Sequence, residues 1–227
     1  MADKLLDVNG LNVSVEEKEI LHDINLSINK GETHVLMGPN GAGKSTLGFA
    51  LMGSPKYTLN SGEILFNGKN INDETPDKRS KDGIFLSFQS PLEVPGLSLS
   101  SFIRNALEKN RGKRIRLWDF KKELRQAMEL LQMLLLNPKL AILDETDSGL
   151  DVDAVRTVSK GVEHYRKNRD GALLIITHST GILESLKVDY THIMVNGHIV
   201  KTGDASLIDE INEHGFEKYL ELYAEKF

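Results

Sequence analysis

The sequence lacks cysteine altogether: none of its 227 residues carries a thiol. This absence excludes disulfide bonds and any metal or cluster site built from thiolates within the chain. Long apolar runs are missing as well, since none approaches the roughly 18 residues that a membrane-spanning helix needs. The first residues also lack the apolar core of a signal peptide. We therefore expect a cytoplasmic protein that makes no direct membrane contact.

An excess of basic residues is missing too. The chain has 28 Lys and Arg against 33 Asp and Glu, which gives a net charge of −5. Such a balance provides no overall attraction to nucleic acid, and we expect no nucleic-acid partner. The basic run at residues 109–125 is a local exception. It is either a docking surface for an acidic partner or a solvated helical face, and the interspersed Asp119 and Glu123 favour the second.

The most informative stretch is a glycine-rich segment with the pattern G-x-x-x-x-G-K-[ST]. An apolar run at 33–37 precedes it and a helical pattern at 47–52 follows it, which is the context of a phosphate-binding loop. The glycines let backbone N–H groups surround phosphate oxygens, the lysine adds a positive charge, and the serine hydroxyl can bind Mg²⁺. A turn that merely caps a helix is the alternative, but all four fixed positions are filled. The predicted nucleotide-binding residues are Gly38, Pro39, Asn40, Gly41, Ala42, Gly43, Lys44, Ser45 and Thr46.

The N-terminal third has the pattern of an antiparallel sheet beside this loop. Apolar and polar residues alternate at 5–15 and 20–28, which is the period of half-buried strands. Further strands are predicted at 61–66 and 83–88, and Asn67-Gly68 is a tight-turn signal.

The rest of the chain has helical patterns first and alternating elements afterwards. Helical spacing of apolar residues at 98–110 and 117–136 predicts a helical middle. From residue 140, strands and helices alternate, which predicts a parallel sheet with helices on both faces. The predicted strands are 140–143, 172–176, 190–195 and 198–201, the last two joined by a turn at Asn196-Gly197, and the predicted helices are 151–167, 204–212 and 216–227.

Four polar residues come at the ends of predicted strands, where the ligands of open α/β sheets gather. Asp144 follows an apolar strand, and its carboxylate can hold Mg²⁺. The adjacent Glu145 can act as a general base on the attacking water. Gln89 can reach the metal or that water, and His178 can hydrogen-bond the γ-phosphate or the water. The alternatives are a helix-capping carboxylate pair and a structural histidine, and the other six histidines are assigned no role.

This order of motifs resembles that of the ATP-binding-cassette (ABC) ATPases. The corresponding elements are a Q-loop glutamine (Gln89), a Walker B pair (Asp144 and Glu145), a D-loop (148–151, ending in Asp151) and a switch histidine (His178). The resemblance implies an α/β fold with a P-loop (RecA-like) core around a parallel sheet, an N-terminal antiparallel β-subdomain and a helical subdomain. It assigns residues 1–227 to a single ABC ATPase domain, with the core and β-subdomain at about 1–88 and 137–227 and the helical subdomain at about 89–136.

The same resemblance implies an enzyme that hydrolyses ATP with Mg²⁺ as cofactor. It makes Glu145 and His178 the catalytic residues. It adds Gln89 and Asp151 to the phosphate loop as ATP contacts, and it gives Mg²⁺ the ligands Ser45, Gln89 and Asp144. In this family ATP binding joins two copies head to tail, so transient, ATP-dependent self-association is expected.

A narrower resemblance is to the SufC-type ATPases of the SUF iron–sulfur cluster assembly system. It is carried by residues 89–98 and 144–151, in which Thr146-Asp147-Ser148 stands where most transport cassettes have Pro-Thr-Ser. It implies SufB-like and SufD-like partner subunits, which would bring the cluster ligands that a cysteine-free chain lacks. The nucleotide-binding subunit of an ABC membrane transporter is the alternative, because it shares the motor and differs in its partner.

One family motif is absent from the sequence: the signature segment Leu/Phe-Ser-Gly-Gly-Glu. Gln89 and Asp144 are only 55 positions apart, and about two dozen residues are missing near 132–136, as estimated from the length of a loop and a helix. Either the deletion is real or the protein contains a segment that these 227 residues do not include, and an intact mass of 25.3 kDa would exclude the second explanation. In this family the signature of one subunit binds the γ-phosphate held by the other. A real deletion would therefore favour an ATP-gated binding module without turnover.

Overall fold

The computed structural model describes residues 3–87, 137–145, 171–178 and 186–226, together with a few isolated positions between them. The strands are β1 (Lys4–Val15), β2 (Lys18–Asn29), β3 (Thr33–Met37), β4 (Tyr57–Phe66), β5 (Lys69–Asn70), β6 (Ile84–Ser87), β7 (Leu140–Asp144), β8 (Ala172–Ile176), β9 (Tyr190–Val195) and β10 (His198–Gly203). The helices are α1 (Lys44–Met52), α2 (Pro76–Asp82), α7 (Ser206–His214) and α8 (Glu217–Lys226). Every predicted strand is present, whereas the predicted helices at 98–110, 117–136 and 151–167 lie almost wholly outside the described residues.

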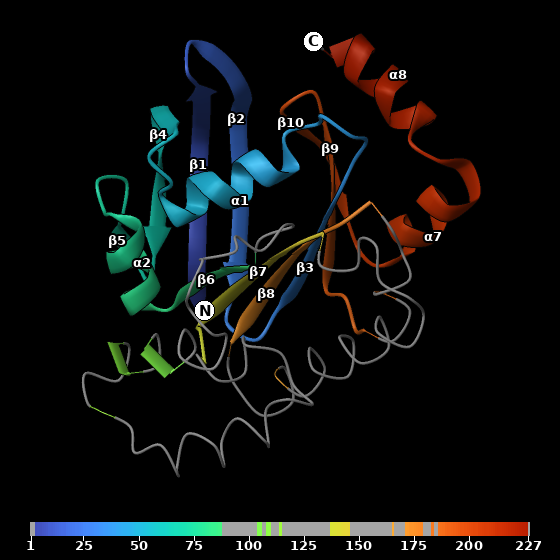
Figure 1. The fold of residues 1–227 in the computed structure, drawn as a ribbon. Coiled ribbons are helices and arrows are strands. Elements are labelled where there is room, and N and C mark those ends of the chain that lie inside the picture. Colours follow the sequence, from blue (N-terminus) through green and yellow to red (C-terminus); the bar gives the residue numbers. More distant parts are fainter. Residues whose placement is uncertain are drawn as a thin grey trace, which may run out of the picture.

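The N-terminal strands form a four-stranded antiparallel sheet with the order β2-β1-β4-β5 (Figure 1). This confirms the predicted antiparallel sheet. Strand β4 begins at Tyr57, four residues before its predicted start at Ser61. Gly62, which was included in the predicted strand, has a φ of 86° inside it. A Cβ at Gly62 would lie 2.4 Å from the backbone oxygen of Gly10, so glycine is required at this contact between β4 and β1.

The second sheet has six strands in the order β10-β9-β3-β8-β7-β6. Strands β9, β3, β8, β7 and β6 run parallel, and only β10, the hairpin partner of β9, is antiparallel to its neighbour. Strands β3, β7 and β8 are buried at all five of their positions. This is the pattern of a parallel sheet that is covered on both faces, as the continuous apolar runs predicted.

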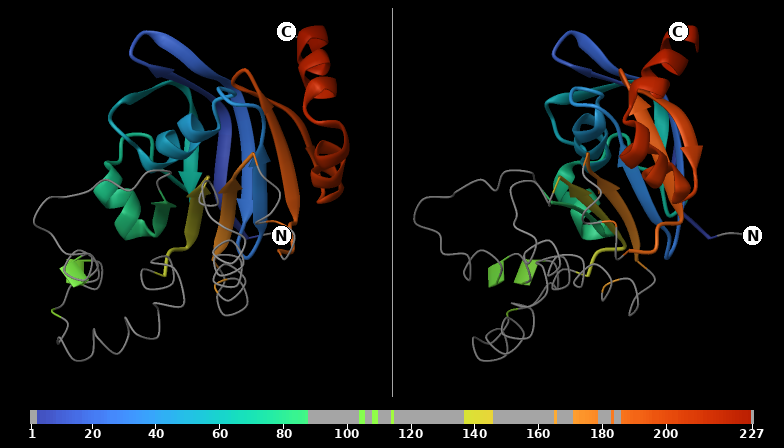
Figure 2. Two further views of the ribbon diagram at one scale, coloured as in Figure 1. Left: turned by 45° about the vertical axis from the view of Figure 1, so that its right-hand side comes forward. Right: turned by 90° about the vertical axis from the view of Figure 1, so that its right-hand side faces the viewer.

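Alternate residues of the six-stranded sheet enter two separate cores. Leu36 of β3 belongs to a core that also contains apolar residues of the four-stranded sheet and of α1. Its neighbours Val35 and Met37 belong to a second core, to which α7 and α8 contribute Leu207, Ile208, Ile211 and Tyr219. Figures 1 and 2 show this arrangement, with α1 against the four-stranded sheet and α7 and α8 beside β9 and β10. Among the described residues no helix has the length and apolar character needed to cross a bilayer.

Helix α2 was not predicted, because its residues show no helical spacing of apolar side chains. The sequence indicates this helix only at its start, where Thr75 occupies the N-cap position and Pro76 the first turn. The helix carries Arg79, which is 1% exposed. Among the described residues, the Arg79 guanidinium donates hydrogen bonds to four backbone carbonyls at 2.9–3.0 Å: those of Ala50 and Leu51 at the end of α1, and those of Asn72 and Glu74. A short polar helix thus supplies the cation that caps α1.

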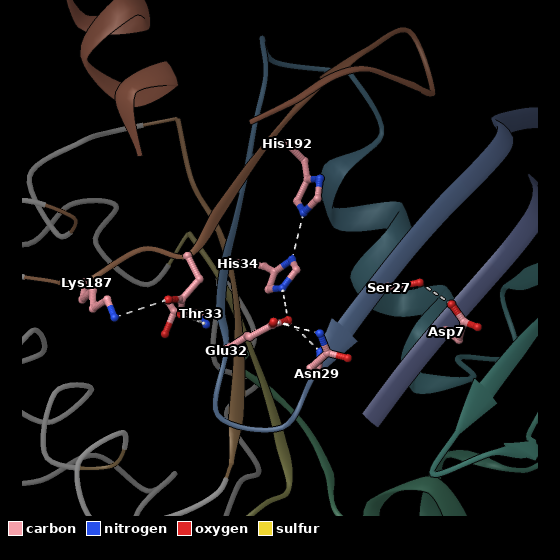
Figure 3. Close-up of polar contacts among 9 residues, drawn as sticks. Asp7, Ser27, Asn29, Glu32, Thr33, His34, Lys187 and His192 are labelled. Carbon is pink, nitrogen blue, oxygen red and sulfur yellow. Dashed lines mark hydrogen bonds and ion pairs between the residues drawn. The ribbon is translucent and has the colours of Figure 1, made fainter. Parts of the chain in front are cut away.

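A chain of hydrogen-bonded polar side chains connects β3, β9 and β10, and Figure 3 shows its part from Glu32 through His34 to His192. His34 Nε2 lies 3.0 Å from Glu32 Oε2, and His34 Nδ1 lies 2.9 Å from His192 Nε2. His192 Nδ1 lies 2.9 Å from the Thr202 hydroxyl. The carboxylate can only accept, so the protons have one consistent arrangement, with each imidazole neutral and protonated on Nε2. These histidines were assigned no role from the sequence, since a histidine within a strand carries no signal of its partners.

Both histidines are held in their neutral form. Burial, and to a smaller extent the neighbouring His34, lowers the pKa of His192 to about 3. Burial also lowers the pKa of His34, against the opposing effect of Glu32 and Asp189. In the unfolded chain a histidine has a pKa near 6.5. Above pH 6.5 His192 is neutral in both the native and the unfolded state. Below pH 6.5 it binds a proton in the unfolded chain but stays neutral in the native protein.

The stability of the protein is therefore expected to fall as the pH is lowered from 7 to 5. His192 alone accounts for a loss of about 2 kcal/mol in the free energy of unfolding over this range. Urea unfolding at pH 7, 6 and 5 measures the loss. In His192→Gln the free energy of unfolding should fall less steeply with decreasing pH. The control His214→Gln changes an exposed histidine, and its free energy of unfolding should depend on pH as that of the wild type does. Equal slopes in the wild type and in His192→Gln would show that His192 does not cause the effect.

Candidate nucleotide site

The glycine-rich segment connects β3 to α1 at the carboxyl edge of the parallel strands. Gly41 and Gly43 have φ values of 80° and 102°, which favour glycine. Gly43 caps α1 without a side-chain hydrogen bond, and the first turn of the helix has no acidic residue. The first N–H groups of a helix have no partner within the helix, so this end can bind an anion. The segment lines a cavity of about 480 Å³ together with three residues from other elements, namely Ile20, Glu145 and His178.

Lys44 is the first residue of α1 and is only 5% exposed. Its Nζ donates hydrogen bonds to the carbonyl oxygens of Gly38 (2.8 Å) and Pro39 (3.1 Å). Burial lowers the pKa of Lys44, while the carboxylates of Glu145 and Asp144 act in the opposite direction. The ammonium group is thus held by neutral carbonyls inside the loop, where a phosphate oxygen can replace them as a stronger, charged partner.

Ser45 and Asp144 meet although they are far apart in the sequence. The Ser45 hydroxyl donates a hydrogen bond of 3.1 Å to Asp144 Oδ1. Asp144 ends β7 and is 2% exposed, and burial raises the pKa of its carboxyl group while the bond from Ser45 lowers it. A hydroxyl and a carboxylate are the oxygen ligands that Mg²⁺ prefers, and this ion usually completes its coordination with phosphates and water. The pair fits a magnesium site of that kind.

Glu145 and His178 form a second pair on the wall of the cavity. Glu145 follows β7 with a φ of 46°, and its N–H donates to the carbonyl of Ile176 at the end of β8 (2.8 Å). Its Oε1 lies 3.1 Å from His178 Nδ1, and the side chains of Glu145 and His178 are 11% and 44% exposed. A carboxylate in this position can accept a proton from a water molecule, and the imidazole can orient the carboxylate.

The structure therefore brings together most of the residues predicted from the sequence. The phosphate loop, Ser45 with Asp144, and Glu145 with His178 occupy one edge of the sheet. Gln89, Asp151 and the segment at 132–136 lie outside the described residues, so their predicted roles remain predictions. Sequence reasoning missed Ile20 of β2, which lines the cavity. Its place in an alternating strand indicated burial but not a neighbouring loop.

Comparison with known proteins gives the family. The family described as "ABC transporter" matches residues 21–148, which is more than half of the chain. The chain belongs to the ABC transporter family. This ABC cassette is 41% identical to the probable ATP-dependent transporter ycf16 of Pyropia yezoensis, over 96% of the chain and 98% of that relative. It is 40% identical to a probable ABC transporter ATP-binding protein of Streptococcus pyogenes serotype M3, over 93% of each chain.

Solved structures of ABC cassettes share the fold. A nucleotide-free ATP-binding cassette from an ABC transporter superposes with a TM-score of 0.78, over 97% of this chain and 98% of that one, at 21% identity. A bacterial ABC transporter cassette solved as a dimer gives a TM-score of 0.75 over 88% and 98% of the two chains, at 18% identity. The predicted ABC ATPase fold is confirmed, and the chain is an ATP-binding cassette subunit. Because the relatives are named as transporter proteins, the comparisons do not support the expectation of no membrane contact.

The relatives of this ABC cassette also contain residues that it lacks. The alignment with the Pyropia relative has 247 positions, whereas the cassette has 227 residues, so at least 20 positions of the relative have no counterpart here. The alignment with the Streptococcus relative has 242 positions, so at least 15 positions of that relative have no counterpart here. The difference agrees in size with the predicted absence of about two dozen residues.

Proposed function

We propose that this ABC cassette binds ATP with Mg²⁺ and hydrolyses it. The phosphate loop and the start of α1 bind the phosphates, and Lys44 exchanges its carbonyl partners for phosphate oxygens. Ser45 and Asp144 hold Mg²⁺, with Gln89 as the third proposed ligand. Bound Mg²⁺ would supply positive charge against the phosphate oxygens. Glu145 accepts the proton of the attacking water, and His178 keeps the carboxylate directed into the cavity. Asp151 is the remaining proposed ATP contact.

The magnesium assignment predicts that Asp144→Asn weakens the Mg²⁺-dependent part of ATP binding. The amide keeps the shape of the side chain and removes the charge, so the loss should be about tenfold or more. Titration of a fluorescent ATP analogue with Mg²⁺ and again with excess chelator separates the Mg²⁺-dependent part of the affinity from the Mg²⁺-independent part. The control Asp73→Asn alters an exposed aspartate and should change neither. If Asp144→Asn binds the ATP analogue with wild-type affinity both with Mg²⁺ and with excess chelator, Asp144 is not a magnesium ligand.

For the biological role we propose a cytoplasmic ATPase of the SufC type, which powers iron–sulfur cluster assembly through SufB-like and SufD-like partners. The observation that carries this proposal is the run at 144–151, with Thr146-Asp147-Ser148 after the Walker B glutamate. The absence of cysteine supports it, because such a subunit energises assembly while its partners hold the cluster. In this proposal ATP binding joins two copies, and their closure remodels the attached partners.

Copurification from the native source tests the biological role. The tagged chain should bring down soluble SufB-like and SufD-like subunits, in a complex whose composition changes between ATP and ADP. The second candidate, a transporter subunit, is favoured by the names of the relatives. Recovery of a multispanning membrane protein in place of the soluble subunits would establish that candidate and refute the first.

A third candidate is an ATP-gated module without turnover. It is favoured by the shortfall of at least 20 positions against the Pyropia relative, because a cassette without the signature segment could not complete the site of a second copy. Phosphate release from the intact chain with its partners present distinguishes the candidates. Steady release supports the ATPase, whereas tight ATP binding without release supports the module.

A further inference from the structure

Two hairpins of this chain have the same turn in different surroundings. Asn67-Gly68 joins β4 to β5 with φ values of 50° and 75°, and Asn196-Gly197 joins β9 to β10 with φ values of 44° and 80°. Positive φ at both central residues defines the turn that suits a two-residue hairpin. A Cβ at Gly68 would meet no atom within 4 Å, whereas a Cβ at Gly197 would lie 2.0 Å from the backbone oxygen of Ile20. The second hairpin is therefore packed against other backbone.

The β9–β10 hairpin touches the phosphate loop at three residues. The N–H group of Gly197 donates a hydrogen bond of 2.8 Å to the carbonyl oxygen of Ala42. A Cβ at Gly38 would lie 2.1 Å from the carbonyl oxygen of Met194. A Cβ at Gly43 would lie 3.5 Å from both the Met194 sulfur and the Gly197 Cα. The hairpin thus excludes any side chain at Gly38, whereas it only packs in ordinary contact beside Gly43, where the close neighbour of an added Cβ is Leu21 of β2 at 2.9 Å.

Two further elements hold the hairpin in place. The carbonyl oxygen of Gly197 accepts a hydrogen bond of 2.9 Å from the N–H group of His22 in β2. The His22 and His198 rings stack with centroids 4.9 Å apart. The His198 ring also lies beside the ring of Tyr223 in α8, with a centroid distance of 5.5 Å and a tilt of 48°. The hairpin is therefore fixed by β2 and α8 before any nucleotide is bound.

We propose that the β9–β10 hairpin, residues 194–198, is a positioning element that sets the direction of a phosphate-binding amide. The carbonyl of Ala42 and the N–H group of Gly43 belong to one trans peptide, in which they point in opposite directions. The bond from Gly197 holds the carbonyl toward the hairpin, which turns the Gly43 N–H away from the hairpin and toward the cavity that Gly43 lines. The hairpin thereby raises ATP affinity without touching the nucleotide. This inference depends on ATP binding and not on the proposed role in cluster assembly.

The test compares Gly197→Ala with Gly68→Ala. Both place alanine in the same backbone conformation, so they share the local strain, but only the first displaces a turn that contacts the loop. Titration with a fluorescent ATP analogue should show affinity about five- to tenfold weaker for Gly197→Ala, the effect of one misplaced hydrogen bond, and within about twofold of the wild type for Gly68→Ala. Inorganic triphosphate should lose affinity by the same factor as ATP, because the loop contacts phosphates alone. Where turnover is measured, KM should rise with little change in kcat.

Thermal unfolding in the same buffer establishes that each variant is folded during the titration. If Gly197→Ala does not fold, His198→Ala takes its place, with His214→Ala as the control at an exposed histidine of α7. His198→Ala removes the stack that holds the hairpin and should weaken ATP binding about two- to fivefold. A folded Gly197→Ala, or in its place His198→Ala, that binds ATP and triphosphate with wild-type affinity would overturn the proposal. An equal loss of ATP affinity in the matching control, Gly68→Ala or His214→Ala, would also overturn it.

Discussion

Glu145→Gln is expected to slow ATP hydrolysis by about two to four orders of magnitude, which is the usual contribution of a general base. Glutamine keeps the shape of the side chain but cannot accept the proton of the attacking water. Glu145 lies on the cavity wall at 3.1 Å from His178, so the loss should fall on the chemical step and leave the phosphate loop intact. Phosphate release under single-turnover conditions, measured with the partner subunits present, gives the rate, and equilibrium titration gives the affinity for ATP.

The matched control is Glu63→Gln, which makes the same substitution in β4. Glu63 accepts a hydrogen bond from Asn9 and is remote from the cavity, so hydrolysis should proceed at the unmutated rate. Two results would contradict the assignment. Hydrolysis by Glu145→Gln at the wild-type rate would remove Glu145 from the chemistry, and a parallel loss of ATP binding would show that its role is in binding.

Arg79→Met is expected to lower the free energy of unfolding by about 3 to 5 kcal/mol. Methionine fills much of the same volume but donates no hydrogen bond. The four carbonyls that Arg79 now binds, two of them at the end of α1, would then lose this donor, and the Ala50 carbonyl would keep its hydrogen bond from the N–H group of Gly53. Urea unfolding monitored by circular dichroism, with the slope of the transition compared between variants, measures this loss.

Lys78→Met is the control for Arg79→Met, because it removes a positive charge from the same helix at an exposed position. Its free energy of unfolding should stay within about 0.5 kcal/mol of the wild type. Arg79→Lys separates charge from geometry, since an ammonium group cannot reach four carbonyls at once and should recover only part of the loss. If Arg79→Met is as stable as Lys78→Met, the buried guanidinium is not needed to hold α1.

The strands and the core of the site could be predicted because their signals are local. A buried parallel strand is a short apolar run, and a phosphate loop needs glycines, lysine and a hydroxyl at fixed spacing. The polar residues that follow β7 and β8 were expected together because carboxyl ends of parallel strands share one edge. The structure shows this for Glu145 and His178, which are 33 positions apart in the sequence.

Contacts that depend on tertiary packing could not be predicted in the same way. Arg79 lies in a helix with no apolar spacing, and its partners are backbone carbonyls, which carry no residue-specific signal. His34 and His192 become a pair only because β3 and β9 are neighbours in the sheet, and the sequence did not predict that order. Likewise the two Asn-Gly turns have the same sequence signal, and only their surroundings distinguish them.

The absence of an acidic residue from the first turn of α1 affects how the dipole of this helix is compensated. The aligned peptide dipoles of a helix act as about half a positive charge at its start and half a negative charge at its end. At the end of α1 the negative charge is met by Arg79, a cation from another helix. At the start, Lys44 adds a second positive charge, and the helix has no acidic residue of its own there. In the proposed nucleotide site the phosphates of ATP would balance the macrodipole at the start of α1 as Arg79 does at its end, which would link nucleotide binding to the stability of this helix.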